Sequence, residues 1–285
     1  MTAIKDPSGR YLVLGKHGKT GRRVCRELER IGANVTGVSR TTLPAFSWQD
    51  KTLTWQNLFT GFDAIYITYQ PDLAIPSAAQ DIARLSIAAR QAGVKQLVLL
   101  SGRGEAGAQE AEQILAQSGL RYHVIRASWF NQNFSEGFIA DMVAAGQVVL
   151  PQGNMPEPFI DVDDIADAVV QCLINPGIEP GIYEVTGPQL LTFKDCVEII
   201  SQQLGKTVAF NDVDVDDFLA VLKGHGATED VLWLMKLLFS EVLDGRNKYT
   251  TDVLEKLLGR PPTTFVEYVE NAFGQSASFK SATME

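Results

Sequence analysis

The chain has 285 residues, of which 45% are hydrophobic and 21% are charged. This is the composition of a globular protein that can form one large α/β domain, alone or with a smaller lobe. Its 25 basic and 34 acidic residues give a formal net charge of −9, which argues against nucleic acid or an anionic membrane as the main partner. The polar opening stretch MTAIKDPSGR, and the lack of an apolar run of about 18 residues, predict a cytoplasmic protein without a leader or membrane span.

The cysteines and histidines are few and scattered. The three cysteines lie far apart and are odd in number, which fits a reducing compartment. None of these cysteines or the three histidines stands at a metal-ligand spacing such as H-x3-H or C-x2-C, so no metal site is expected. His123 lies within an apolar run and is expected to be a structural histidine.

Short apolar runs alternate with helix-like segments through the first half of the chain. Strands are expected at 11–14, 34–39, 63–68, 96–100 and 122–126. Helices are expected at 20–31, 75–92 and 108–118, with a helix or turn at 55–62. Continuous apolar strands separated by helices indicate a parallel sheet covered on both faces, which predicts an α/β, Rossmann-type doubly wound fold.

The regular alternation ends near residue 127. Helices are expected at 134–145, 161–173, 192–204, 227–243, 251–258 and 264–273, and a strand at 181–185. These elements predict a first domain over 1–150, to which the chain returns near 159–186, a smaller C-terminal substrate or cap lobe over 151–274, and a disordered tail at 275–285.

A glycine-rich stretch, GKHGKTG, follows the first expected strand. It is not a phosphate-binding P-loop, because G-x4-G-K-[ST] would place its first glycine at position 13, which is Val13. The spacing of Gly15, Gly18 and Gly21 instead fits the turn of a dinucleotide-binding fold, in which the helix N-terminus faces the pyrophosphate. His17, Lys19 and Thr20 belong to the same turn and are included among the expected cofactor-binding residues.

The end of the second strand indicates which dinucleotide binds. NAD-binding folds usually place an acidic residue there for the ribose 2′-hydroxyl, but this chain has Ser39 and Arg40, with no acid before Asp50. Arg40 can pair with a 2′-phosphate and Ser39 can hydrogen-bond to it. NADP(H) is therefore the expected cofactor, and the first domain is expected to bind it.

With these residues in view, the sequence resembles the NmrA-like branch of the atypical short-chain dehydrogenases, from about Tyr11 to Phe273. The matching stretches are LVLGKHGKTGRRV, AIYITYQPD, VKQLVLLSGRG, SGLRYHVIRASWFNQNFSE, PFIDVDDIADAVV, YEVTGPQLLTF and LLGRPPTTF. The family includes NADPH-dependent quinone reductases, triphenylmethane dye reductases, clavine dehydrogenases and non-catalytic dinucleotide sensors. The resemblance implies a Rossmann domain, a small C-terminal lobe and a substrate bound between them.

One feature departs from typical short-chain dehydrogenases, which use a Tyr-x3-Lys pair as the proton donor. No tyrosine here is followed by lysine four residues later. Quinones, iminium ions and conjugated acceptors are already electron-poor, so their reduction requires mainly that the nicotinamide be placed against them. Gln109 stands where relatives carry lysine or histidine; it can bond the nicotinamide ribose or lie on a solvated helix face.

Further candidates follow the later strands, since ligands of open α/β sheets bind beyond the carboxyl ends of the strands. Cofactor-binding candidates at these ends are Thr68, Tyr69, Gln70, Ser101, Gly102 and Trp129. Tyr69, Ser101 and Trp129 are also the candidate catalytic residues. For each of these three an alternative stays open: packing for Tyr69, a helix cap for Ser101, and a core aromatic pair for Trp129.

The sequence thus predicts an NADP(H)-dependent reductase that transfers hydride to a flat, electron-poor organic substrate without a Tyr-Lys dyad. The alternative is a non-catalytic NADP(H)-binding redox sensor that regulates a protein partner. A small aromatic or conjugated molecule is the expected substrate, and the protein is expected to be a monomer or homodimer.

Overall fold

The computed structural model describes residues 8–50 and 54–274. The predicted tail at 275–285 lies outside the described residues. Contacts along the chain group it into two compact units. Among the described residues, the first comprises 8–50, 54–127, Val162–Val185 and Asp252–Pro261, and the second comprises Ser128–Asp161, Thr186–Thr251 and 262–274. The assignment of cofactor and substrate roles to separate domains stays a prediction.

The first unit is built on a six-stranded sheet with the order β2-β1-β3-β4-β5-β7. Its strands are β1 (Arg10–Leu14), β2 (Asn34–Val38), β3 (Ala64–Ile67), β4 (Gln96–Gly102), β5 (Arg121–Ala127) and β7 (Gly181–Val185). Every neighbouring pair is parallel, so all the strands end at the same edge. The predicted α/β doubly wound fold is confirmed.

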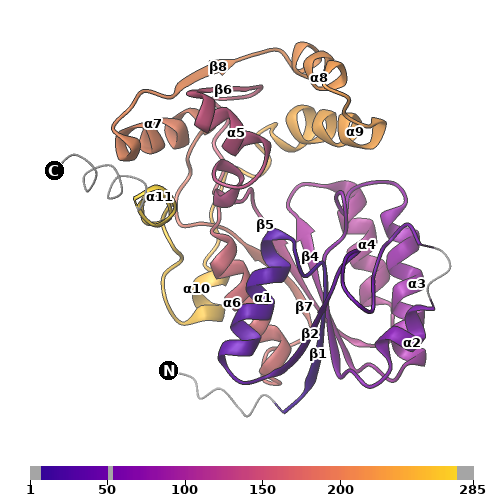
Figure 1. Ribbon diagram of the computed structural model, residues 1–285. Helices are drawn as coiled ribbons and strands as arrows, with labels where there is room; N and C mark the ends of the chain where they lie inside the picture. The colour runs from indigo at the N-terminus through magenta and orange to yellow at the C-terminus, as the bar shows by residue number, and fades with distance from the viewer. Residues whose placement is uncertain (1–7, 51–53, 275–285) are drawn as a thin grey trace. The chain divides into compact units, whose positions relative to one another are not determined.

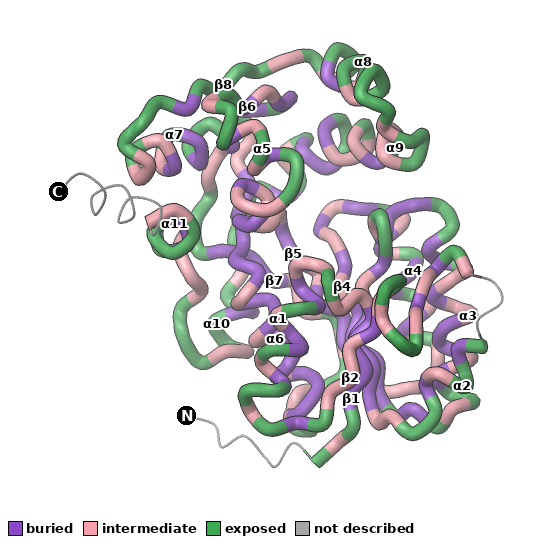
Figure 2. The backbone as a smooth tube through the Cα atoms, in the orientation of Figure 1, coloured by how far each residue is buried: buried purple, intermediate pink, exposed green. Residues whose placement is uncertain are grey.

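Helices cover both faces of this sheet (Figure 1). One face carries α1 (Lys19–Arg30), α6 (Val162–Ile174) and α10 (Val253–Leu258), and the other carries α2 (Trp55–Phe59), α3 (Ala78–Gln91) and α4 (Ala106–Ala116). Figure 2 shows that the central strands are buried almost throughout, as expected for strands packed on both sides. This is why these strands are continuous apolar runs in the sequence instead of alternating with polar residues.

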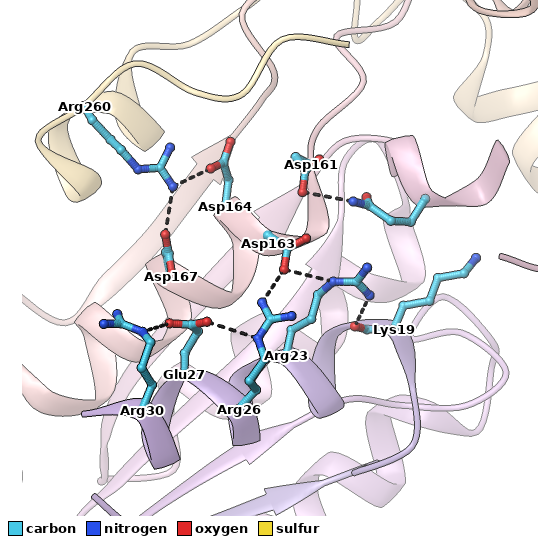
Figure 3. Close-up of polar contacts among 11 residues, drawn as sticks. Lys19, Arg23, Arg26, Glu27, Arg30, Asp161, Asp163, Asp164, Asp167 and Arg260 are labelled. Carbon is cyan, nitrogen blue, oxygen red and sulfur yellow. Dashed lines mark hydrogen bonds and ion pairs between the residues drawn. The ribbon is translucent and has the colours of Figure 1, made fainter. Parts of the chain in front are cut away.

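Charged side chains join α1, α6 and the segment after α10 (Figure 3). Asp163 of α6 forms ion pairs with Arg23 and Arg26 of α1, at 3.2 and 2.5 Å. Arg260 pairs with Asp164 at 2.6 Å and with Asp167 at 2.7 Å. These contacts fix α6 against α1 and hold the returning segment 252–261 on the first unit.

The second unit contains a two-stranded parallel sheet and an aromatic core. The strands are β6 (Gln147–Leu150) and β8 (Ala209–Asp212). The helices are η1 (Asn131–Phe134), α5 (Phe138–Ala145), α7 (Phe193–Leu204), α8 (Val215–Gly224), α9 (Glu229–Leu237), η2 (Leu238–Val242) and α11 (Phe265–Phe273). Phe193 lies within 6.3 Å, between ring centroids, of the rings of Phe134, Phe159 and Phe239.

Four elements of the second unit were not predicted from the sequence, namely η1, β6, α8 and β8. The predicted helix 227–243 also differs from the structure, where α9 ends at Leu237 and a π-helical turn follows. The Leu243 amide bonds to the Leu238 carbonyl at 3.0 Å, five residues back, which widens the turn. Among the described residues, no helix has the length and apolarity needed to cross a bilayer.

Candidate cofactor-binding site

The glycine turn between β1 and α1 depends on close backbone approach. Gly15 has a φ of +82°, and a Cβ there would lie 2.3 Å from Oγ1 of Thr68. Gly21 lies inside α1, and a Cβ on it would lie only 2.2 Å from the carbonyl oxygen of Gly15. Glycine at these two positions therefore lets the start of α1 pack directly against the end of β1, as the dinucleotide-binding spacing predicts.

The N-terminus of α1 is suited to an anion. Its N-cap residue is Gly18, which provides no side-chain cap, and the first turn holds no acidic residue. The first N–H groups of a helix lack intrahelical partners, and the helix dipole adds partial positive charge there. This end of α1 can therefore bind a phosphate group through its backbone.

The segment after β2 folds back over the end of the sheet. The Ser39 carbonyl accepts a hydrogen bond from the Phe46 amide at 2.8 Å, and the Ser39 amide donates to Oγ1 of Thr42 at 2.8 Å. These bonds close the loop, in which Arg40 is exposed directly after Ser39. A charged guanidinium on a closed loop is well placed to contact a phosphate from solvent.

A cavity of about 400 Å³ lies where these segments meet. Its walls come from the carboxyl ends of β1, β2 and β3, which are neighbours in the sheet. It is lined by Gly15, His17, Gly18, Ser39, Arg40, Thr41, Phe46, Ser47, Trp48, Gln49, Thr68 and Gln70. The structure thus brings seven of the sequence-predicted cofactor residues together, from segments up to 55 positions apart (Gly15 to Gln70).

Five lining residues were missed by sequence reasoning: Thr41 and the stretch from Phe46 to Gln49. Within the stretch from Phe46 to Gln49, Trp48 is held in place by its indole N–H, which donates to the Thr68 carbonyl at 3.1 Å. Its ring also packs edge-on against Phe46, with centroids 5.1 Å apart. The signal available in the sequence was the run FSWQ, placed soon after Arg40 and rich in aromatic and hydrogen-bonding groups.

Other predicted cofactor residues do not line this cavity. Thr20 and Gly21 are buried within α1, and Lys19 is half-buried at its start. Gly102 ends β4, and Gln109 is half-buried on α4. Their direct contact with a cofactor stays a prediction.

Tyr69 is buried beside the cavity wall. Its hydroxyl donates to Oδ2 of Asp81 at 2.8 Å, and its ring lies 4.5 Å from that of Trp48. Burial raises the pKa of Tyr69 to about 12, so the hydroxyl is a weaker acid than an ordinary tyrosine. These contacts favour the packing alternative for Tyr69, and its catalytic role stays a prediction.

Ser101 is buried and belongs to a partly buried chain of polar contacts at the ends of β4, β5 and β7. Its hydroxyl donates to Oε1 of Glu112 at 2.6 Å, and Glu112 is also paired with Arg126. Arg126 in turn contacts Glu184 at 3.4 Å, and Arg103 pairs with the same carboxylate at 3.0 Å. Because the Ser101 proton is held by Glu112, this hydroxyl is oriented as an acceptor more readily than as a donor.

Trp129 lies in the second unit and is half-buried. Its ring packs edge-on against Phe193, with centroids 5.2 Å apart, and lies 5.6 Å from that of Phe239. These contacts agree with the alternative in which Trp129 belongs to a core aromatic pair. A role for Trp129 in cofactor or substrate binding stays a prediction.

Within the described residues, no group of three His, Cys, Asp or Glu side chains is arranged to hold a metal ion. His123 is fully buried, with hydrogen bonds to Gln96 at 3.1 Å and to the Ile178 carbonyl at 3.2 Å. Burial lowers the pKa of His123, so the ring is neutral at physiological pH. A more open depression of about 490 Å³ lies on the second unit beside α7 and contains none of the predicted site residues.

Comparison with known proteins shows which family the chain belongs to. Prestalk A differentiation protein A of Dictyostelium discoideum is 24% identical over 97% of this chain and 96% of its own length. Festuclavine synthase I of Penicillium roqueforti (strain FM164) is 27% identical over 91% of this chain and 97% of its own length. The crystal structure of the Citrobacter sp. triphenylmethane reductase complexed with NADP(H) superposes with a TM-score of 0.77 at 19% identity, covering 92% of this chain and 99% of that chain. The model of the NmrA-like family matches residues 9–269, so the chain belongs to the NmrA-like family.

Proposed function

We propose that the protein is an NADPH-dependent reductase that transfers hydride to a flat, electron-poor organic substrate such as a quinone, an iminium ion or a conjugated ene. The observation that carries this proposal is the cavity that gathers the glycine turn, Arg40 and Thr68 at adjacent strand ends. The name of the similar festuclavine synthase and the NADP(H) complex of the similar triphenylmethane reductase support a cofactor and a reaction of this class.

The lining residues fit the parts of NADP(H). The uncapped start of α1 would hold the pyrophosphate, and Ser39, Arg40 and Thr41 would hold the 2′-phosphate. The wall from Phe46 to Gln49 would hold the adenine, with apolar rings against its face and amide or hydroxyl groups at its edge. Thr68 and Gln70 lead from there toward the ends of β4 and β5.

Neither candidate hydroxyl group, that of Tyr69 or that of Ser101, is arranged to donate a proton to a substrate, and this limits the substrates that the proposed reductase could reduce. When bound, the cofactor supplies hydride from its nicotinamide ring. Tyr69 is a weak acid bonded to Asp81, and the Ser101 proton is held by Glu112. With no Tyr-Lys pair in the sequence, the site favours acceptors whose reduced form takes its proton readily from water.

A second candidate is a non-catalytic NADP(H) sensor. It is favoured by the relative matched over 97% of the chain, which is named for a role in differentiation and not for a reaction. Both candidates require NADPH binding, and only the reductase requires that NADPH be consumed when an acceptor is present.

Replacing Arg40 by alanine is expected to weaken NADPH binding by about tenfold and NADH binding by less than about twofold. The exposed guanidinium can interact with the 2′-phosphate, which NADH lacks, and solvent keeps the effect at the lower end of the range for charged hydrogen bonds. Isothermal titration calorimetry with both dinucleotides measures this difference.

The matched control is Arg90→Ala, which removes the same charge from an exposed position at the end of α3. It should leave both affinities unchanged. Equal affinities of the native protein for NADPH and NADH, or an equal loss of both in Arg40→Ala, would show that Arg40 does not read the 2′-phosphate.

The reductase itself is tested with a panel of a p-quinone, a cyclic iminium ion and a conjugated enone, following NADPH absorbance. We expect oxidation that requires both the protein and at least one acceptor. Tight NADPH binding without turnover on the whole panel contradicts the reductase and supports the sensor.

A further inference from the structure

A closed circuit of five side chains includes Trp48, which lines the cofactor cavity. The rings of Tyr69 and Trp55 lie 4.5 and 5.5 Å from the Trp48 ring, between centroids. The Tyr69 hydroxyl donates to Asp81 at 2.8 Å, and the Arg84 guanidinium carbon lies 3.8 Å from the centroid of the Trp55 ring. An ion pair between Arg84 and Asp81, at 3.7 Å, closes the circuit.

The two charged members of the circuit belong to α3. Asp81 and Arg84 are three positions apart, which places them on one side of the helix, and the Asp81 side chain is only 14% exposed. Two guanidinium nitrogens of Arg84, Nε and Nη2, are buried and have no hydrogen-bond partner among the described residues. The Asp81 carboxylate and the face of Trp55 therefore hold this cation, and through it they fix Trp55 against α3.

Trp48 depends on such contacts for its position. The stretch from Phe46 to Gln49 belongs to no helix or strand, so backbone hydrogen bonds of a regular element do not fix it. The Phe46 ring packs 5.1 Å from that of Trp48 and 5.7 Å from that of Trp55. Three aromatic rings thus hold the Trp48 indole, and two of them, Tyr69 and Trp55, are themselves held by α3.

Tyr69 connects the circuit to a second part of the cavity. It lies between Thr68 and Gln70, which both line the cavity. Besides donating to Asp81, its hydroxyl lies 3.3 Å from the Ser77 hydroxyl, immediately before α3. The anchoring of Tyr69 therefore fixes the chain on both sides of this residue as well as the ring that packs on Trp48.

A fixed aromatic wall favours the binding of a flat ring. A side chain that is already held in its binding orientation loses less conformational entropy when the ligand arrives. The purine is the flat ring assigned above to the wall from Phe46 to Gln49. Among the described residues that line the cavity, neither Asp81 nor Arg84 occurs, so their influence on the purine would act through Trp48.

We propose that Asp81 and Arg84 are positioning residues, which hold Trp48 in the orientation that binds the purine of the dinucleotide. The proposal rests on the proposed function for the identity of the ligand. It divides the site into a phosphate part, formed by Arg40 and the start of α1, and a purine part whose geometry is set from α3.

The test uses adenosine 2′,5′-bisphosphate, the half of NADP(H) that carries the purine and the 2′-phosphate, alongside NADPH. Asp81→Ala removes the acceptor of Tyr69 and the partner of Arg84, and we expect it to weaken the binding of both ligands by about fivefold. Asp81→Asn keeps an acceptor for the Tyr69 hydroxyl and should recover part of this loss. Arg90→Ala is the control, because it removes a charge from an exposed position on the same helix and should leave both dissociation constants unchanged.

A double-mutant cycle with Trp48→Leu shows whether Asp81 acts through Trp48. Leucine keeps an apolar side chain in the wall but removes the ring, so Asp81→Ala should cause less than about a twofold further loss in this background. In the Arg40→Ala background the two losses should multiply, because Arg40 belongs to the phosphate part. A loss from Asp81→Ala that stays complete in Trp48→Leu contradicts a positioning role, since a general loosening of the fold would not depend on Trp48.

Tryptophan fluorescence of the native protein gives a second measurement that needs no variant to fold. Saturating adenosine 2′,5′-bisphosphate should change the emission, because the purine would pack against Trp48. Unchanged native emission at saturation, or unchanged affinities in Asp81→Ala, overturns the inference and leaves the proposed function in place. Failure of the native protein to bind both ligands contradicts the proposed function, and this inference with it.

Discussion

Gly21→Ala is expected to weaken NADPH binding by at least about tenfold and to lower the free energy of unfolding by about 1–3 kcal/mol. The added methyl group would lie 2.2 Å from the Gly15 carbonyl oxygen and 2.8 Å from its carbonyl carbon. Both are backbone atoms of the turn, so the clash can be relieved only by moving α1 away from β1. That movement displaces the helix N-terminus that is proposed to hold the pyrophosphate.

Gly224→Ala is the matched control, since Gly224 also lies in a helix and a Cβ there would have no atom within 4 Å. It should leave the affinity for NADPH unchanged and the free energy of unfolding unchanged or slightly higher, because alanine favours the helical conformation more than glycine does. Calorimetric titration and denaturant unfolding measure both quantities. Native NADPH affinity in Gly21→Ala would show that the glycine turn does not set the position of the cofactor.

Arg260→Ala is expected to destabilise the protein by about 2 kcal/mol. Its partner Asp164 has a side chain only 1% exposed, so the substitution removes a strong partner from a buried carboxylate. Breaking a fully buried pair costs about 3–5 kcal/mol, and the 44% exposure of the Arg260 side chain reduces that cost. Denaturant unfolding should show a lower midpoint with an unchanged slope if the fold is retained.

Arg246→Ala is a close control for this substitution. Arg246 is also 44% exposed and pairs with Asp244 at 2.7 Å, but Asp244 is itself 41% exposed. Removing this ion pair should lower the free energy of unfolding by about 0–1 kcal/mol, the range for surface ion pairs. Equal effects of the two substitutions would show that burial of Asp164 does not determine the strength of the Arg260 contact.

The sequence predicted the sheet of the first unit well, because each of its strands is a short apolar run bounded by turn or helix signals. All six strands were expected close to their observed positions, and the parallel arrangement followed from their buried, non-alternating pattern. The order β2-β1-β3-β4-β5-β7 could not be predicted from the residues, because pairing between distant strands leaves no local pattern in the sequence.

The second unit was harder to predict because its elements are short and partly exposed. Strand β8 has no buried residue and half of its four side chains are polar, so it lacks the period of a strand. Helix α8 buries only Phe218, which gives too weak an apolar stripe to identify it. Neither element can be recognised without the neighbours that it packs against.

The candidate site was predictable where backbone geometry dictates residue type. Gly15 and Gly21 were identified from their spacing, and the structure gives each a steric reason. The wall around Trp48 was missed because it lies on an irregular loop whose position depends on contacts such as the bond to Thr68. The hydrogen bond from Ser101 to Glu112 could not be predicted from the sequence either, because it joins the end of a strand to the face of a helix.

The most direct test of the proposed reaction is deuterium transfer from NADPH labelled at the nicotinamide C4 to a cyclic iminium ion. With the label on the transferred face, the reductase should give an amine that carries one deuterium at the former iminium carbon, with one NADPH oxidised per amine formed. Both stereoisomers of the labelled cofactor are used, and Gly21→Ala provides the control with weakened binding. An unlabelled amine with both stereoisomers, or no amine despite tight NADPH binding, would contradict direct hydride transfer by this protein.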